Sequence, residues 1–148
     1  MDPLMKYISR IHRCAKRYRG ARLCGEGLSA AQHVYILQVC KFPGITQDAL
    51  AGHICVNKSN VTRQLGTLEQ SGYVERRPDP ADRRVLHVYP TAKAQEIFPQ
   101  VRALMQEWNR LLLEGLSSAQ RAQLTALLEH LTQRAIALTE QEVGGPEK

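Results

Sequence analysis

Six polar side chains able to make hydrogen bonds cluster in one short stretch of the 148-residue chain: Lys58, Ser59, Asn60, Thr62, Arg63 and Gln64. Proteins read DNA with such groups: arginine pairs with guanine and glutamine with adenine through two hydrogen bonds, and hydroxyls and amides often hold phosphates. Arg63 and Gln64 are therefore expected at base edges. Ser59, Asn60 and Thr62 suit bases or phosphates. Any one of these residues alone is better explained as solvated or phosphate-bound, so the prediction depends on the cluster.

An amphipathic helix would present this cluster on one side. Val61, Leu65 and Leu68 recur at spacings of four and three and mark a buried face. Asn57 precedes them as a helix cap, and Gly72 follows at a position where a left-handed residue ends a helix. The polar cluster then lies near the N-terminus of the helix, from which recognition helices reach base edges.

Two short strands are expected after this helix. Residues 73–76 and 85–89 are rich in β-branched and aromatic residues and are bounded by turn residues. Residues 77–84, with the sequence RPDPADRR, form a charged tip with two prolines. A helix followed by a hairpin with a basic tip is the plan of a winged helix, with the helix for one groove and the wing for another.

The arginines of the wing have separate expected roles. Arg83 is the expected tip residue, suited to a narrow minor groove. Arg84 is expected either at DNA or paired with Asp82, which would brace the loop. Arg76 and Arg77 lie at the root of the wing and suit phosphates, although Arg77 equally suits a role in solubility.

The wing sequence resembles that of MarR-type transcriptional regulators, whose signature is Asp-x-Arg-x-x-x-Val-x-Leu-Thr-x-x-Gly. The matching residues are Asp82, Arg84, Val88 and Thr91, whereas Pro90 replaces the leucine and Ala94 the glycine. The order and length of the segments are similar over most of the chain. The resemblance implies a mainly α fold with a small β-hairpin wing: a winged helix-turn-helix with terminal dimerisation helices.

The segment before the recognition helix predicts the rest of a helix-turn-helix. Residues 29–32 have a capping-box pattern in front of a buried helix at residues 34–39. Ile45 is expected to add a short strand, and Thr46 to cap a small helix that runs through His53. The expected inner face of that small helix is Ala49, Leu50 and Ile54. An ordinary helical corner is the alternative, which the attached wing disfavours.

Long apolar stripes mark both ends of the chain, within residues 4–18, 97–112 and 124–138. They exceed what a small winged-helix body covers, so residues 4–22 and about 100–142 are expected to pack against their counterparts in a homodimer. A monomeric three-helix core with extensions and an interfacial membrane helix at the N-terminus are the less favoured alternatives. A single domain is expected, with residues 29–94 as the DNA-binding part and residues 1–24 and 95–142 as the dimerisation part.

Charge and composition narrow the class of partner. The formal net charge is +6, and residues 1–24 carry seven Lys or Arg side chains and one Asp. A basic front favours a protein that lays one side on a polyanion. Residues 1–20 lack the apolar core of a signal peptide, and no apolar run is long enough to span a membrane. Reduced cysteines and a cytoplasmic location are therefore expected.

The sequence lacks catalytic motifs, and its possible metal-binding motif is incomplete. The sequence has no Gly-rich phosphate loop, no His-Glu-x-x-His and no nucleophile elbow, so an enzyme is not expected and no cofactor is assigned. The carboxylates Asp79 and Asp82 lie on an exposed hairpin, where raised pKa values are not expected. Cys24, Glu26 and His33 are three possible metal ligands, but the later histidine pair of zinc-sensing relatives is missing, and no metal site is assigned.

Signal reception is the least determined part of the function. Cys14 lies among arginines in the first helix, and nearby cations favour oxidation of a thiol. Peroxide-sensing relatives also carry a cysteine in the first helix, although simple apolar packing of Cys14 is the alternative. In the family, effectors bind between the dimerisation helices and the winged-helix body. The candidate pocket residues, each equally plausible as core, are Tyr7, Ile11, Tyr18, His33, Leu37 and Trp108.

Taken together, the residues and the resemblance predict a homodimeric transcriptional regulator of double-stranded DNA. It would bind a pseudo-palindromic operator, as a repressor in most relatives, and release it on a small-molecule or oxidant signal. The alternative is an architectural winged-helix protein that coats DNA without sequence preference and without an effector.

Overall fold

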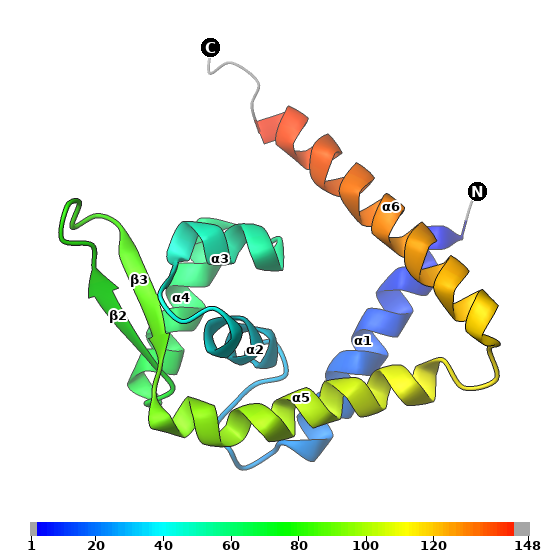
Figure 1. Ribbon diagram of the computed structural model, residues 1–148, viewed down its shortest axis with the longest axis horizontal. Helices are drawn as coiled ribbons and strands as arrows, with labels where there is room; N and C mark the ends of the chain where they lie inside the picture. The colour runs from blue at the N-terminus through cyan, green and yellow to red at the C-terminus, as the bar shows by residue number, and fades with distance from the viewer. Residues whose placement is uncertain (1–2, 144–148) are drawn as a thin grey trace. The chain divides into compact units, whose positions relative to one another are not determined.

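The computed structural model describes residues 3–143. Its elements are α1 (Leu4–Arg22), α2 (His33–Lys41), β1 (Ile45–Thr46), α3 (Gln47–Ile54), α4 (Lys58–Gln70), β2 (Val74–Pro78), β3 (Leu86–Pro90), α5 (Ala92–Leu112) and α6 (Ser118–Val143) (Figure 1). One compact unit ends at Trp108 and a second begins at Asn109. Among these helices, none is long and apolar enough to cross a membrane. The fold is the mainly α winged helix-turn-helix expected from the sequence.

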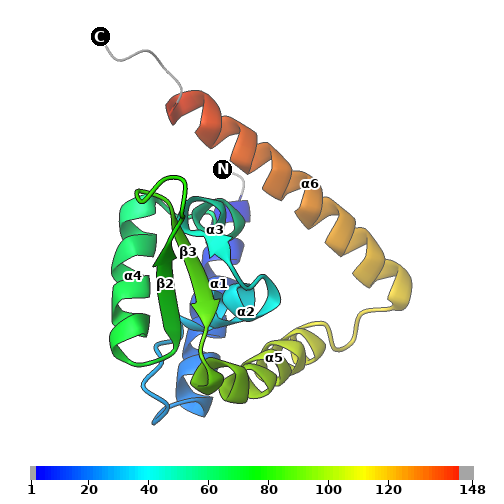
Figure 2. The ribbon, with the colours of Figure 1, turned by 60° about the vertical axis from the view of Figure 1, so that its left-hand side comes forward.

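A small antiparallel sheet forms the wing and its support. Its strand order is β1-β3-β2, with Ile45 opposite Val88 and Arg76 opposite the same residue on the other side. The hairpin of β2 and β3 lies beside α4 (Figure 2). Both predicted wing strands are confirmed, each displaced by one or two residues along the chain, and the short strand at Ile45 is confirmed as well.

The core of the first unit lies where α2, α3 and α4 meet the sheet. Val61, Leu65 and Leu68 are fully buried, as their spacing predicts. They join a core cluster whose fully buried members also include Ile36, Val39, Leu50, Val88 and Val101. Because one side of α4 is buried in this way, its opposite side is held facing solvent.

The expected inner face of α3 is partly wrong. Leu50 and Ala51 are buried and Ile54 is half-buried, whereas Ala49 is exposed. Residues on an α-helix are separated by about 100°, so a stripe centred on Leu50, Ala51 and Ile54 turns Ala49 outward. Ala49 serves the helix start instead, because its backbone nitrogen donates to the capping Thr46 Oγ1 at 3.1 Å.

The expected helix caps are present, with one difference. Asn57 Oδ1 accepts from the Asn60 nitrogen at 2.8 Å, and Gly72 has a left-handed φ of +79° just past the end of α4. At residues 29–32 the glutamine side chain of the capping box reaches back to Ser29, but α2 begins only at His33. An isolated turn therefore precedes α2, because the Gln32 nitrogen donates to the Ser29 carbonyl oxygen.

Candidate nucleic-acid interface

The turn between α3 and α4 places the N-terminus of α4 at the surface. Cys55 ends α3 in the left-handed conformation, with φ of +57°, and Asn57 then starts α4. Two side-chain contacts join the helices: Gln47 Nε2 donates to Thr62 Oγ1 at 3.4 Å, and Lys58 Nζ lies 3.2 Å from Asp48 Oδ2. The arrangement is a helix-turn-helix, as predicted.

The outer face of α4 holds an arginine that the fold does not use. Arg63 is exposed and makes no side-chain hydrogen bond or ion pair with the residues that the structure describes. Together with Asn57, Ser59 and Asn60 it lines a shallow, open depression. Lys58 is also open to solvent, since its pair with Asp48 leaves 75% of its side chain exposed. Exposed pairs of this kind are weak, so Lys58 stays available to an anion.

Three other polar residues of the predicted cluster are tied to the protein itself. Asn60 Oδ1 accepts from the hydroxyl of Tyr35 at 3.0 Å, and Gln64 Oε1 accepts from Gln32 Nε2 at 3.2 Å. Thr62 Oγ1 donates to the Lys58 carbonyl oxygen at 3.0 Å. The sequence pattern showed which side of α4 these residues occupy but not these partners, which come from α2, from the turn before it and from the backbone.

The tip of the wing is braced by its own side chains. The Arg84 guanidinium donates to both oxygens of Asp82 at 3.1 and 3.2 Å, and the Arg84 backbone nitrogen donates to the same carboxylate. These bonds from Arg84 hold the pKa of Asp82 below its usual range. The expected pairing of Asp82 with Arg84 is confirmed. Arg83 is exposed and has no side-chain partner within residues 3–143.

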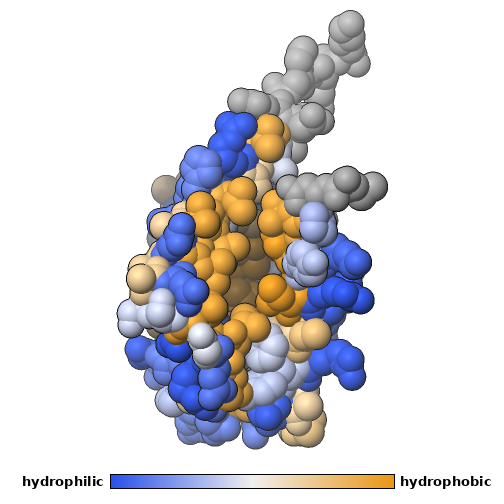
Figure 3. Space-filling view, turned by 90° about the vertical axis from the view of Figure 1, so that its right-hand side faces the viewer, coloured by the Kyte–Doolittle hydropathy of each residue, from blue (hydrophilic) through white to orange (hydrophobic). Residues whose placement is uncertain are grey.

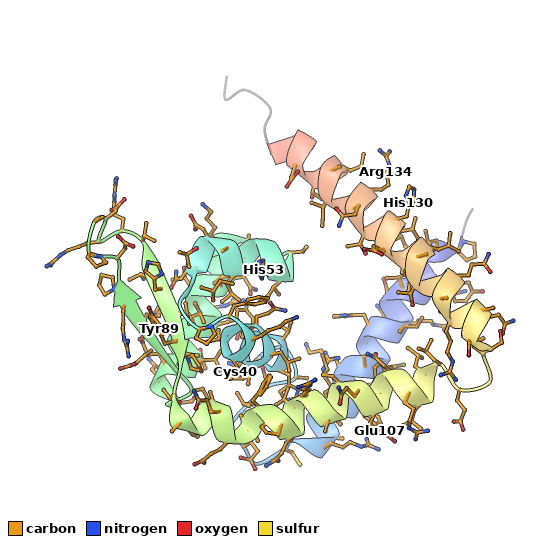
Figure 4. The ribbon with its side chains drawn as sticks, in the orientation of Figure 1. Cys40, His53, Tyr89, Glu107, His130 and Arg134 are labelled. Atoms are coloured by element: carbon orange, nitrogen blue, oxygen red, sulfur yellow. The ribbon has the colours of Figure 1, made fainter. Side chains whose placement is uncertain are left out.

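The two arginines at the root of the wing differ. Arg76 is only 19% exposed; its guanidinium donates to Glu69 Oε2 at 2.7 Å and to Gln47 Oε1 at 3.3 Å. Hydrogen bonds from Arg76 lower the pKa of Glu69. Arg77 is open, pairing with Glu75 at 2.7 Å and lying 4.4 Å from the centre of the Tyr89 ring, on β3 (Figure 4). Arg76 therefore fastens the wing to α4, whereas Arg77 faces solvent.

A histidine that sequence reasoning missed, His87 on β3, links the wing loop to the segment before β1. His87 Nδ1 lies 2.8 Å from the Gly44 carbonyl oxygen, and its Nε2 lies 2.8 Å from Asp79 Oδ2. Both partners are acceptors, so the two contacts require a proton on each ring nitrogen. The bond to Asp79, followed by that to Gly44, raises the pKa of His87. The bond from His87 is in turn the main reason that the pKa of Asp79 is lowered. The available signal was a histidine in the wing strand with an aspartate across the hairpin.

The candidate sensor residues are placed differently from one another. Cys14 and Tyr7 are exposed on α1, and Tyr18 packs on Trp108 with ring centres 5.0 Å apart. His33 is fully buried, and neither ring nitrogen has a hydrogen-bond partner. Burial, followed by the nearby charge of Arg19, lowers the pKa of His33. Ile11 is exposed and Leu37 half-buried.

The structure also bears on the possible metal ligands. Within residues 3–143, no three His, Cys, Asp or Glu side chains come close enough together to hold a metal ion. Cys24, Glu26 and His33 are thus not brought together, and the Cys24 thiol lies 3.5 Å from the Ala21 carbonyl oxygen. The reason is that His33 points into the core, whereas the loop that carries Cys24 and Glu26 is exposed.

Comparison with known proteins agrees with this geometry. Residues 28–86 match the model of the MarR family. The chain is 24% identical over 131 residues to the uncharacterized HTH-type transcriptional regulator YybA of Bacillus subtilis, covering 88% of this chain and 87% of that protein. It is 30% identical to a crystal structure of MarR, with a TM-score of 0.81 over 95% of this chain and 98% of that one.

A mutant MarR from E. coli complexed with operator DNA is also similar, at 28% identity and a TM-score of 0.78, over 87% of this chain and 93% of that one. The chain is therefore a member of the MarR family of winged-helix, DNA-binding transcriptional regulators.

Proposed function

We propose that the protein is a homodimer that binds a pseudo-palindromic operator as a repressor and releases it on a small-molecule or oxidant signal. The observation that carries the DNA-binding part is the pair of partnerless arginines, Arg63 on α4 and Arg83 on the wing, among the residues described. These two arginines lie on the two elements that a winged helix places against DNA, one element in the major groove and the other against the minor groove.

The DNA contacts divide by element. On α4, the proposed contacts are Lys58, Ser59, Asn60, Thr62, Arg63 and Gln64, with Arg63 bidentate to guanine. On the wing, Arg83 would enter the minor groove, and Arg84 and Arg77 would meet phosphates, since both guanidinium groups stay open to solvent. Arg76 is better explained as the link between wing and α4, because most of its guanidinium is enclosed by Glu69 and Gln47.

The dimer is proposed from apolar side chains that a single chain leaves exposed. In α6, none of the side chains described is buried, although the helix has a leucine stripe. Figure 3 shows apolar side chains at the molecular surface. The exposed large apolar residues of α1 and of the region after residue 109 are Leu4, Met5, Tyr7, Ile8, Ile11, Leu111, Leu112, Leu124, Leu127, Leu128, Leu131 and Leu138. Burying one such side chain contributes about 1.5–3 kcal/mol, so a partner surface is strongly favoured. Residues 1–24 and 95–142 would form that surface, leaving residues 29–94 for DNA.

The effector site is proposed near His33. A buried imidazole without partners, close to an Arg19 Nε that is also buried without a partner, is costly in a closed core. A ligand with acceptor groups for the Arg19 Nε–H and the single N–H of neutral His33, and with a donor for the other ring nitrogen of His33, would satisfy both side chains. Tyr18, whose ring packs at a tilt against Trp108, belongs to the same unit and supplies an aromatic wall of the kind that small-molecule sites use. No catalytic role is proposed for any residue.

The decisive experiment is selection of bound sequences from a random DNA pool, followed by competition between the selected site and bulk DNA. A regulator should prefer its site by several orders of magnitude at fixed salt. Equal affinity for both DNAs would instead support an architectural protein that coats DNA. Repeating the binding with oxidant and with phenolic acids then tests for release.

A further inference from the structure

The amide of Gln32 has a defined orientation. Its Oε1 accepts from the Ser29 backbone nitrogen at 2.9 Å. A backbone N–H can only donate, so the end of the amide that it meets must be the oxygen. The other end of Gln32 is therefore the NH₂ group, which has no acceptor capacity. Gln32 is 5% exposed, so water competes little for these bonds.

This orientation is passed on to α4. The Gln32 NH₂ group lies 3.2 Å from the side-chain amide of Gln64, and since it can only donate, the atom it meets is Gln64 Oε1. The half-buried Gln64 side chain is thereby left with its own NH₂ group as the end not engaged with Gln32. Neighbouring Asn60 is oriented in the same way, with its oxygen toward the protein, because the hydroxyl of buried Tyr35 donates to its Oδ1.

We propose that Gln32 is a specificity-determining residue, which makes Gln64 read DNA as a hydrogen-bond donor only. This inference rests on the proposed function, in which α4 enters the major groove. A free glutamine pairs with adenine by donating to N7 and accepting from N6, which requires both ends of its amide to face the same base. The Oε1 end of Gln64 is turned toward Gln32 instead, so only its NH₂ group is left to face a base. Guanine presents two acceptors, N7 and O6, on the same edge. The position that Gln64 reads should therefore prefer guanine to adenine.

The other groups on this face determine how far the inference extends. Arg63 is also a donor only, which adds to a preference for guanine at its own position. Ser59 is different: its hydroxyl donates to Asn57 Oδ1 at 2.9 Å, so its lone pairs remain free to accept from DNA. The inference thus concerns Gln64, whose hydrogen-bonding character is determined by Gln32 in the turn that precedes α2.

The test compares base preferences selected by wild type, Gln64→Ala, Gln32→Leu and Gln64→Glu. Gln64→Ala identifies the position that Gln64 reads. There, wild type should prefer guanine, and Gln32→Leu should move the guanine-to-adenine ratio about tenfold toward adenine, because the Gln64 oxygen is released. Gln64→Glu keeps an oxygen for Gln32 and presents a second one to DNA, so it should favour cytosine, whose N4 donates.

The matched control is Gln38→Leu, which also removes a glutamine amide. Gln38 lies on α2 and contacts His53 of α3, not α4. Gln38→Leu should keep the wild-type preference. The inference is overturned if both Gln32→Leu and Gln64→Glu still prefer guanine at the position that Gln64 reads. It is also overturned if wild type prefers adenine there, or if no position responds to Gln64→Ala. Absence of any sequence preference in wild type would instead mean that the proposed function itself is wrong.

Discussion

Two arginines on different elements should show different dependence on DNA sequence. Arg63→Ala should cost about 1–3 kcal/mol of operator affinity and flatten the preference at one position per half-site, because a bidentate contact to guanine is lost. Arg83→Ala should weaken binding most where the flanks are A·T-rich, because a minor-groove arginine responds to groove width. Affinity measured at fixed salt on operators with altered cores and altered flanks separates the two. If Arg63→Ala lowers affinity equally on every DNA sequence, then α4 contacts only phosphates and does not read bases.

His87 should make operator binding depend on pH. Its pKa is raised by Asp79 and Gly44, and the pKa of Asp79 is lowered by His87. Both partners are therefore charged at pH values between the lowered pKa of Asp79 and the raised pKa of His87. Its stabilising effect is full below the ordinary histidine pKa and is lost as pH rises through the raised one. Operator affinity should then fall toward alkaline pH, because a neutral ring can keep only one of its two bonds.

The measurement is operator affinity across pH for wild type, His87→Ala and His53→Ala. His87→Ala should bind more weakly below the raised pKa and show a flatter profile. His53 is a fair control, since it lies on α3 and faces Gln38 and the ring of Phe42 (Figure 4). If the His87→Ala profile keeps the wild-type slope, the wing is not held by the imidazolium. Arg77, the cross-strand neighbour of His87, is occupied by Glu75 and Tyr89.

At the scale of elements, Arg76 joins β2 to α4 through Glu69. Removing either side chain should lower the free energy of unfolding by about 1–2 kcal/mol, since a hydrogen-bonded charge loses its partner. The double mutant should cost less than the sum of the two single changes. Chemical denaturation of the four variants measures this coupling.

The salt dependence of DNA binding provides an independent check on Arg76. A side chain that neutralises a phosphate changes the salt slope by about one when it is removed. Arg76→Ala should leave that slope unchanged, whereas Arg77→Ala should reduce it. A reduced slope in Arg76→Ala together with normal stability would show that Arg76 serves DNA and not the wing.

At the scale of the molecule, the folded state should depend on dimerisation. Deleting residues 1–22 or 120–148 should abolish the folded dimer, because the apolar stripes of α1 and α6 then lose the partner surface that burial requires. Analytical ultracentrifugation and thermal melting of both deletions test this. A monomer that still melts cooperatively after either deletion would contradict the proposed role of the terminal helices.

Local features of this protein were readable from the sequence alone. Asn57 and Gly72 bound α4, and Val61, Leu65 and Leu68 turn its polar side outward, because helix caps and apolar spacing act within one or two turns. The brace between Asp82 and Arg84 was predictable for the same reason, since its partners are two residues apart. The wing strands followed from composition and turn residues.

Tertiary structure decided which polar groups those elements leave free. Gln32 and Gln64 are 32 residues apart, and His87 and Gly44 are 43 apart, so no local periodicity connects them. The same holds for Ala49, whose exposure depends on where the core meets α3. A hydrogen bond forms only when packing brings donor and acceptor within about 3 Å, and packing depends on every element at once. Sequence therefore determined which polar side chains lie on the outer face of α4 and on the wing, and the fold determined whether each is left to donate or to accept.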